Sequence, residues 1–315
     1  MKAEQSNNRH KPANHLSDVS LYLKASDLKA SHSKVSKSIV TLGASACLAL
    51  ALSACSKEAS TDETQAAAND APQTTQPAEN IRIAAAANLS DVLPEIIEGY
   101  KADRNLPDQE IEVTFASSGK LYSQITSGAP YDVFLAANQS YPAQLAEEMF
   151  KGEANRTPFT YTQGQLSIYS ATKPVDGLNQ TTLTDLFNSD DKTKITIANP
   201  DLAPYGESAK TYLQSQDLYD SLTAQKRIIQ AENIGQAFQY AHTGSVDYGF
   251  VAHSQVTAIK ATPEQFYILP PESYPAILQD GMVITDVASA EDFADYLRSP
   301  AGQAYFSEAG YLAVK

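Results

Sequence analysis

The stretch that decides the fold is residues 81–137, IRIAAAANLSDVLPEIIEGYKADRNLPDQEIEVTFASSGKLYSQITSGAPYDVFLAA. Short apolar segments alternate in it with segments whose apolar residues recur at helical spacing. The pattern predicts three strands and two helices, in the order strand Ile81–Ala87, helix Leu89–Arg104, strand Ile111–Phe115, helix Ser117–Thr126 and strand Val133–Ala137. Strands that alternate with helices in this way pair in parallel, so the stretch predicts a doubly wound α/β sheet.

The same pattern continues from there to the C-terminus. Strands are predicted at residues 166–170, 195–198, 248–251 and 282–285, and helices at residues 208–216, 234–242, 290–297 and 300–309. The folded part begins near Asn80, after a segment with no apolar side chain larger than alanine or proline. Its length fits two α/β lobes of about 100 residues each better than one.

The N-terminal region is predicted to direct the chain to the cell envelope. Residues 38–54 carry no charge, follow Lys34 and Lys37, and end in Leu52-Ser53-Ala54 before Cys55. A basic region, an apolar stretch and small residues in this order are typical of a secretory signal. The segment resembles a bacterial lipobox, so we expect Cys55 to be lipidated and to become the first residue of the mature chain. Residues 1–55 are therefore interpreted as a lipoprotein leader with a polar N-terminal extension.

The segment that follows Cys55 is interpreted as a tether. Residues 56–79 contain no Val, Ile, Leu, Met, Phe, Tyr or Trp, so they cannot form a hydrophobic core. A disordered tether behind a lipidated cysteine would hold a globular domain near a membrane surface.

Composition argues against several classes of function. There are 23 basic and 37 acidic residues among 315, a formal net charge of −14, which is unfavourable for nucleic-acid binding. Two cysteines are too few for a disulfide scaffold or a four-cysteine zinc site. Neither a Gly-x-Ser-x-Gly elbow nor a phosphate-binding loop is present, so an enzyme is not expected.

Four predicted loops share an unusual composition that is suited to an anion. They are rich in Gly, Ser, Asn or Pro, each precedes a helix, and they comprise residues 86–91, 115–119, 199–206 and 232–237. Each alone fits an ordinary helix cap or a proline-stiffened loop. In an α/β protein such loops lie beyond the carboxyl ends of the strands, where ligands bind. Together they predict a cleft in which uncharged hydrogen-bond donors surround an oxyanion.

These four segments, in this order, resemble the periplasmic molybdate-binding proteins of ABC transporters. The resemblance extends over residues 80–315 and includes Ser127–Phe134, the loop Ala203–Gly206 and the closing helix that begins Ser299-Pro300-Ala301-Gly302. Many members of the family have serine at the position of Asn88 and tyrosine at that of Ala252, so this chain resembles a subgroup that differs at both places.

The resemblance implies a fold and a set of binding residues. It implies a type II periplasmic-binding-protein fold, in which each of two lobes is a mostly parallel sheet flanked by helices and the ligand lies between them. Lobe 1 would comprise residues 80–159 and 271–315, and lobe 2 residues 160–270. The implied ligand-binding residues are Ala87, Asn88, Ser117 and Ser118 from the first lobe and Tyr205 and Ile234 from the second.

The resemblance also implies the biological context. It implies reversible binding of molybdate or tungstate without a cofactor or a catalytic residue, and delivery to an ABC permease with its ATPase. We expect a periplasmic monomer, held at a membrane through Cys55, with no metal site beyond the bound oxyanion.

Other functions remain open at the level of the sequence. Uncharged donors do not distinguish molybdate from sulfate, phosphate or chromate by charge. Tyr161, Tyr205, Tyr240 and Tyr248 leave a metal-binding envelope lipoprotein as an alternative, and a structural lipoprotein or adhesin would bind no solute.

Overall fold

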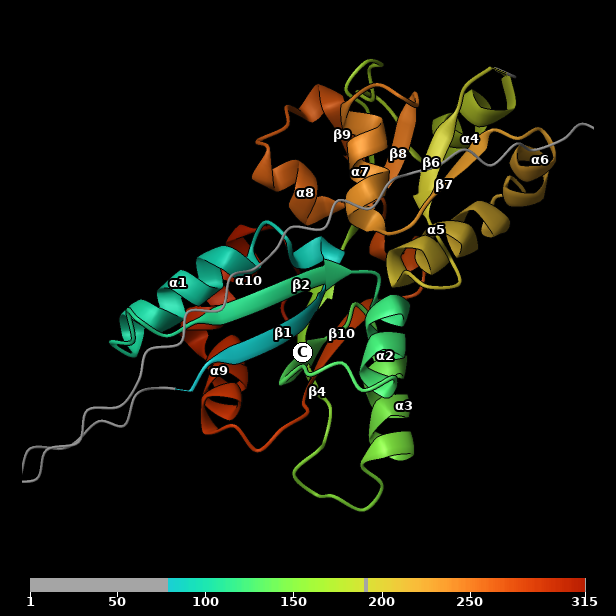
Figure 1. Cartoon of the computed structure of the whole chain (residues 1–315). Helices are drawn as coiled ribbons and strands as arrows, with labels where there is room; N and C mark the ends of the chain where they lie inside the picture. Colours follow the sequence, from blue (N-terminus) through green and yellow to red (C-terminus); the bar gives the residue numbers. More distant parts are fainter. Residues whose placement is uncertain (1–78, 190–191, 315) are drawn as a thin grey trace, which may run out of the picture. The chain divides into compact units, whose positions relative to one another are not determined.

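The computed structural model describes residues 79–189 and 192–314. The predicted leader, the lipidation site Cys55 and nearly all of the predicted tether lie outside these residues. The described chain contains two five-stranded sheets, each flanked by helices on both faces (Figure 1). We refer to the first sheet with its helices as lobe 1 and to the second as lobe 2.

The first sheet has the strand order β2-β1-β3-β10-β4. Its strands are β1 (Ile81–Ala86), β2 (Ile111–Ala116), β3 (Val133–Leu135), β4 (Phe159–Gly164) and β10 (Ile277–Val283). The strands β2, β1 and β3 pair in parallel, as predicted, whereas β10 is antiparallel to both β3 and β4. The sheet is mixed because β10 re-enters lobe 1 from lobe 2 and runs opposite to β3.

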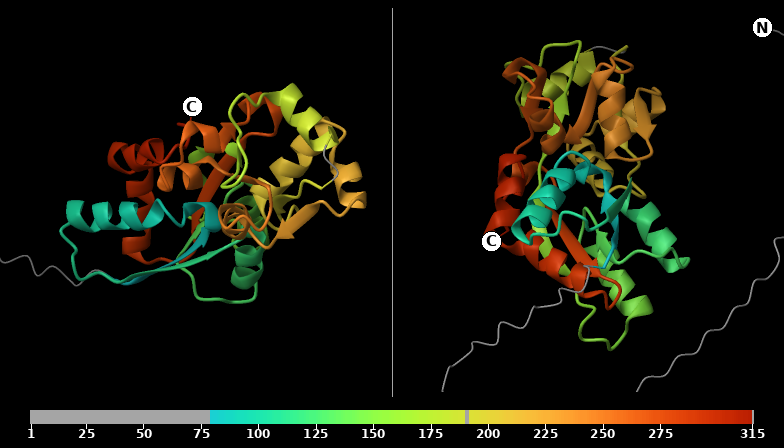
Figure 2. Two further views of the ribbon diagram at one scale, coloured as in Figure 1. Left: turned by 90° about the horizontal axis from the view of Figure 1, so that it is seen from above. Right: turned by 60° about the vertical axis from the view of Figure 1, so that its left-hand side comes forward.

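Both faces of the first sheet are buried, which explains the near-continuous apolar sequence of its inner strand β1. Ile81, Ile83 and Ala85 pack with α1 (Leu93–Asp103), α9 (Ala288–Arg298) and α10 (Pro300–Glu308). Ala84 faces the other side, in a second cluster with α2 (Ser118–Thr126) and α3 (Ser140–Met149). The two views of Figure 2 show these helices on opposite sides of the sheet, α2 and α3 in green and α9 and α10 in red.

The second sheet repeats this arrangement, with the strand order β7-β6-β8-β5-β9. Its strands are β5 (Leu166–Tyr169), β6 (Ile195–Ala198), β7 (Ile228–Ala231), β8 (Tyr248–Ala252) and β9 (Phe266–Ile268). Here β7, β6 and β8 are parallel, and β5 is antiparallel to β8 and β9.

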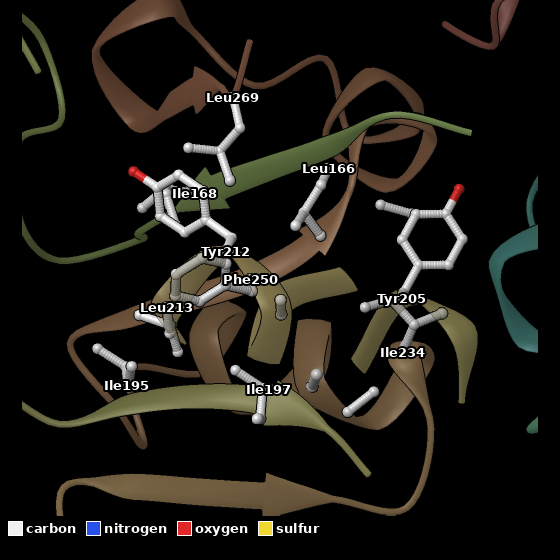
Figure 3. Packing of buried hydrophobic residues seen from close by; sticks show 14 of the residues in the cluster. Leu166, Ile168, Ile195, Ile197, Tyr205, Tyr212, Leu213, Ile234, Phe250 and Leu269 are labelled. Carbon is white, nitrogen blue, oxygen red and sulfur yellow. The ribbon is translucent and has the colours of Figure 1, made fainter. Parts of the chain in front are cut away.

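The helices of lobe 2 also lie on both faces of its sheet. They are α4 (Gln180–Ser189), α5 (Pro204–Ser215), α6 (Tyr219–Ala224), α7 (Ile234–His242) and α8 (His253–Ala258). The largest core cluster joins Ile195 and Ile197 of β6 to Tyr212 and Leu213 of α5. Figure 3 shows this cluster, with Tyr205 and Ile234 together at one end of it.

The chain passes between the lobes at two places. Only Gln165 separates β4 from β5, and residues 269–276 lead from β9 back to β10. The predicted border between residues 159 and 160 falls inside β4, whereas the chain leaves the first sheet after Gly164. We propose Gln165 and residues 269–276 as the joints of the two lobes.

Most predicted elements are present, with shifted ends. The helix predicted from Leu89 begins at Leu93, because residues 87–89 form a separate 3-10 turn, and the helix predicted from Ser208 begins earlier, at Pro204. Four helices and three strands had no counterpart in the prediction: α3, α4, α6, α8, β4, β7 and β9.

Candidate functional site

The four loops that the sequence analysis selected meet at one pocket. Its lining comes from the carboxyl ends of β1, β2 and β3 in lobe 1 and from the N-termini of α5 and α7 in lobe 2. The lining residues are Ala86, Ala87, Asn88, Ala116, Ser117, Ser118, Ala137, Ala203, Pro204, Tyr205, Asn233 and Ile234. The pocket holds about 190 Å3 of empty space, including its opening to solvent.

All six residues that the resemblance selected line this pocket. Four alanines lie beside them: Ala86, Ala116 and Ala203 belong to the loops that the sequence predicted, and Ala137 lies outside those loops. Their signal is their position, because a small residue at the end of a buried strand lets a ligand approach the backbone. None of the described residues that line the pocket is charged, so an ion held there would depend on hydrogen bonds rather than on a counter-charge.

Lobe 1 contributes two serine hydroxyls to the pocket. The Ser118 Oγ atom accepts a hydrogen bond of 2.9 Å from the backbone N–H of Ala137, so its own hydrogen remains available for a ligand. The Ser117 Oγ atom is buried and has no hydrogen-bond partner among the described residues. Because buried hydroxyls are normally paired, an unpaired one in a pocket indicates a ligand position.

Lobe 2 contributes the beginnings of two helices. Tyr205 is the second residue of α5 and Ile234 is the first residue of α7, where backbone N–H groups have no acceptor within the helix. Pro204 favours the start of α5 because its fixed φ suits the first turn. The side chain of Asn233 caps α7 by accepting a hydrogen bond of 3.0 Å from the Gln236 N–H. The positive ends of both helix dipoles therefore point to the pocket.

Gly206 allows α5 to begin this close to β6. A Cβ atom at this position would lie 2.3 Å from the carbonyl oxygen of Ala198, which is a backbone atom and cannot turn aside. The glycine thereby places the Tyr205 N–H at the edge of the pocket.

Asn88 is completely buried, and its amide is engaged in a way that the sequence analysis did not foresee. The resemblance implies that Asn88 binds the ligand, but its Nδ2 atom donates to Gln279 Oε1 at 2.9 Å and to the Tyr311 hydroxyl at 3.0 Å. The Oδ1 atom of Asn88 has no hydrogen-bond partner within residues 79–189 and 192–314. The backbone carbonyl oxygen of Asn88 accepts a hydrogen bond of 2.7 Å from the Tyr311 hydroxyl.

Three buried tyrosines bond to Asn88 or to its partner Gln279: Tyr311 contacts Asn88, and Tyr161 and Tyr205 contact Gln279. Burial raises the pKa of each phenol well above its usual range. All three therefore stay neutral at physiological pH and keep a hydroxyl hydrogen to donate. The hydroxyl of Tyr205 points away from the core of lobe 2 (Figure 3) and accepts a hydrogen bond of 3.2 Å from Gln279 Nε2.

Direct contacts join the lobes around the pocket. The Gly119 N–H donates to the Leu202 carbonyl at 2.9 Å, and the Ser254 hydroxyl donates to the Asn88 carbonyl at 3.3 Å. Lys120 of lobe 1 forms an ion pair with Glu232 of lobe 2. The structure is thus one in which the two lobes are closed on each other.

In residues 79–189 and 192–314, no three or more His, Cys, Asp or Glu side chains gather as a metal site. No helix in the described part of the chain is long and apolar enough to span a bilayer.

Comparison with known proteins agrees with this geometry. The family model described as bacterial extracellular solute-binding protein matches residues 81–312. The molybdate-binding protein ModA of Azotobacter vinelandii is 32% identical over 240 residues, which cover 74% of this chain and 90% of the relative. ModA of Rhodobacter capsulatus is 32% identical over 206 residues, covering 64% of this chain and 77% of that one.

A solved structure is similar as well. The periplasmic molybdate-binding protein of Azotobacter vinelandii matches with a TM-score of 0.67 and 30% identity, over 75% of this chain and all of that one. These comparisons confirm the resemblance, the two-lobed fold and the interpretation as a binding protein rather than an enzyme. The chain belongs to the bacterial extracellular solute-binding proteins.

Proposed function

We propose that this chain binds molybdate or tungstate in the pocket between its lobes. It delivers the bound anion to an ABC permease and its ATPase. The observation that carries the proposal is the pocket itself, where uncharged donors from both lobes converge. The relatives that are named for molybdate binding support the choice of ligand.

The donor set suits a small, fully ionised oxyanion. A buried anion is stable without a counter-charge only if hydrogen bonds replace its hydration shell. The serine hydroxyls of lobe 1 and the first-turn N–H groups of lobe 2 can supply them, and two helix dipoles add to the attraction. Binding would favour the closed arrangement, because the anion needs donors from both lobes at once.

Tungstate is included because it shares the charge and tetrahedral shape of molybdate. Sulfate and phosphate are smaller or differ in protonation, so uncharged donors at fixed positions must select by the size of the anion. Ala87, Asn88, Ser117, Ser118, Tyr205 and Ile234 are the binding residues that we propose.

We further propose that the protein is a periplasmic monomer attached to a membrane through a lipid on Cys55. The support is the sequence of residues 34–55, which has the order expected of a lipoprotein leader. Replacement of Cys55 by serine should move the protein from the membrane fraction to the soluble fraction. An unchanged distribution, with no lipid found on the N-terminal peptide by mass spectrometry, would contradict the attachment.

Thermal unfolding of the full chain with molybdate, tungstate, sulfate, phosphate or ferric citrate tests the ligand. A ligand at about 100 times its Kd adds about 2.7 kcal/mol to the free energy of unfolding, which raises Tm by several degrees. We expect shifts with molybdate and tungstate alone. A shift only with sulfate or phosphate would reassign the ligand, one only with ferric citrate would favour a metal-binding lipoprotein, and none with any anion would contradict the proposal.

A further inference from the structure

Gln279 lies behind the pocket, on β10, and links residues of both lobes. It is fully buried. Its Oε1 atom accepts hydrogen bonds from Asn88 Nδ2 at 2.9 Å and from the Tyr161 hydroxyl at 3.1 Å. Its Nε2 atom donates to the hydroxyl of Tyr205, in lobe 2, at 3.2 Å. A single amide therefore contacts the pocket residue Asn88 and the pocket residue Tyr205.

The backbone is arranged to bring this side chain into place. The pairing of β10 with β4 shifts by a bulge between Gln279 and Asp280, a feature that redirects side chains beside binding sites. Gly164 provides the space, because a Cβ atom there would lie 2.1 Å from the Tyr205 hydroxyl and 2.7 Å from Gln279 Nε2.

The hydrogen bonds of Asn88, as they stand, conflict with the binding of an anion. Both hydrogens of Nδ2 go to protein acceptors, Gln279 and Tyr311, and the unpaired atom is the acceptor Oδ1. An anion accepts hydrogen bonds and cannot donate one to Oδ1. For the side-chain amide of Asn88 to donate to an oxyanion, it must turn so that Nδ2 takes the place of the unpaired Oδ1.

The surrounding groups can support the reversed amide. If the amides of Asn88 and Gln279 both turn by about 180°, Gln279 Nε2 donates to Asn88 Oδ1 and to Tyr161, and the Tyr205 hydroxyl donates to Gln279 Oε1. Tyr161 keeps its own bond of 2.9 Å to the Ala136 carbonyl. The oxygen and nitrogen ends of an amide have nearly the same size, so the packing is preserved.

Tyr311 can follow the change. Its hydroxyl hydrogen now goes to the Asn88 carbonyl, which Ser254 also contacts, at 3.3 Å. Since Ser254 can satisfy that carbonyl, the Tyr311 hydroxyl can donate to Oδ1 instead, at the distance of 3.0 Å that now separates it from Nδ2. The side chains of Asn88, Gln279, Tyr161, Tyr205 and Tyr311 then all keep partners, and both hydrogens of Asn88 Nδ2 are available to the ligand.

We propose that Gln279 is a positioning residue for the oxyanion: its amide turns together with that of Asn88, so that Asn88 presents a donor to the pocket when the anion is bound. Glutamine suits this position because its amide both donates and accepts, as either orientation of Asn88 requires. The hydrogen bond between Gln279 and the Tyr205 hydroxyl couples this turn of the two amides to lobe 2. This inference rests on the proposed function, since it assumes an anionic ligand.

A double-mutant cycle with molybdate tests the proposal, using titration calorimetry on the full chain. The four proteins are the parent, Asn88→Ala, Gln279→Met and the double variant. Methionine fills a similar volume and is likewise uncharged, but it does not donate a hydrogen bond. We expect Gln279→Met to raise the Kd for molybdate about 10-fold in the parent and at most about 2-fold when Asn88 is already alanine, because Gln279 acts through Asn88.

Gln109→Met is the matched control for loss of a buried glutamine. Gln109 is buried near the opposite end of β2 from the pocket and donates to the Glu79 carbonyl at 2.8 Å. The Gln109→Met variant should leave the Kd for molybdate unchanged. Equal losses from Gln279→Met in both backgrounds, or no loss in either, would overturn the inference. A parent that bound no oxyanion would instead overturn the proposed function, and this inference with it.

A second measurement needs no variant at position 279. Side-chain amide signals of 15N-labelled parent protein, recorded by NMR, should shift for both Asn88 and Gln279 on saturation with molybdate and stay fixed for Gln109. A shift of Asn88 with no change at Gln279 would show that the two amides do not turn together, and would overturn the proposal.

Discussion

The two lobes offer the pocket different kinds of donor. In the proposed site, lobe 1 contributes mainly side chains besides the backbone of Ala87: the hydroxyls of Ser117 and Ser118 and, once it turns, the amide of Asn88. Lobe 2 contributes the backbone N–H groups of Tyr205 and Ile234 at helix starts. The side chain of Tyr205 belongs to the polar network around Gln279 instead. We therefore expect binding to depend on the identity of the side chains in lobe 1 and on the position of the helices in lobe 2.

Removal of the Ser118 hydroxyl should have the largest effect on binding. A hydrogen bond to a charged group contributes about 1.5–3 kcal/mol, so Ser118→Ala should raise the Kd for molybdate about 10- to 100-fold. Titration calorimetry measures the change. Ser123→Ala, on the same helix but bonded to the Gly119 carbonyl, is the control. An unchanged Kd for Ser118→Ala would place the ligand elsewhere.

Removal of the Tyr205 hydroxyl should separate stability from binding. Tyr205→Phe deprives buried Gln279 Nε2 of its acceptor, which should lower the free energy of unfolding by about 1–3 kcal/mol. The backbone N–H remains, so the Kd should change less than about 3-fold. Urea denaturation and calorimetry give the two numbers. A loss of affinity as large as that of Ser118→Ala would mean that the hydroxyl itself contacts the ligand.

Shortening the side chain of Ile234 should also lower stability with little change in binding, and the loss of stability should be smaller. Ile234→Val removes one buried methylene from the largest core cluster, which typically costs about 0.5–1.5 kcal/mol of stability. The N–H of residue 234 is unaffected, so the Kd should stay within about 2-fold. A larger loss of affinity would show that lobe 2 also depends on the identity of its side chains.

Loss of the ion pair across the lobes should cost the least free energy of the four changes. The Lys120 and Glu232 side chains are 48% and 46% exposed, and such pairs contribute about 0.2–1 kcal/mol. Lys120→Gln should therefore weaken binding at most about 5-fold at low salt. The difference from the parent should vanish near 1 M salt, where screening is strong. A larger difference that salt does not reduce would give Lys120 a direct role in the site.

The alternation of strands and helices in residues 81–137 and the four loops were predictable because their signals are local. Apolar runs such as Ile81–Ala87 mark buried strands, and the Ser, Asn, Gly and Pro residues that follow mark helix starts. Two of the missed strands give weaker signals: β4 reads FTYTQG and has no aliphatic side chain, and in β7, which reads IIQA, Gln230 interrupts the apolar run. The antiparallel place of β10 depends on the chain's return from lobe 2, which no local pattern records.

The network behind the pocket could not be predicted for the same reason. Asn88 meets Gln279, 191 residues away, and Tyr311, 223 residues away. The sequence identified Asn88 as a potential donor but gave no means of finding the groups that compete for its hydrogens. Gln279 carries no sequence signal beyond a polar residue inside a buried strand, and that feature could have drawn attention to it.

The central claim is that one uncharged pocket holds the oxyanion between side-chain donors of lobe 1 and backbone donors of lobe 2. A crystal structure of the chain with molybdate, using the anomalous scattering of molybdenum, tests it most directly. The account predicts one anomalous peak in the pocket, with oxygens within hydrogen-bond distance of Ser118 Oγ and of the N–H groups of Tyr205 and Ile234. A peak bound by one lobe alone, or at another place on the molecule, would contradict the claim.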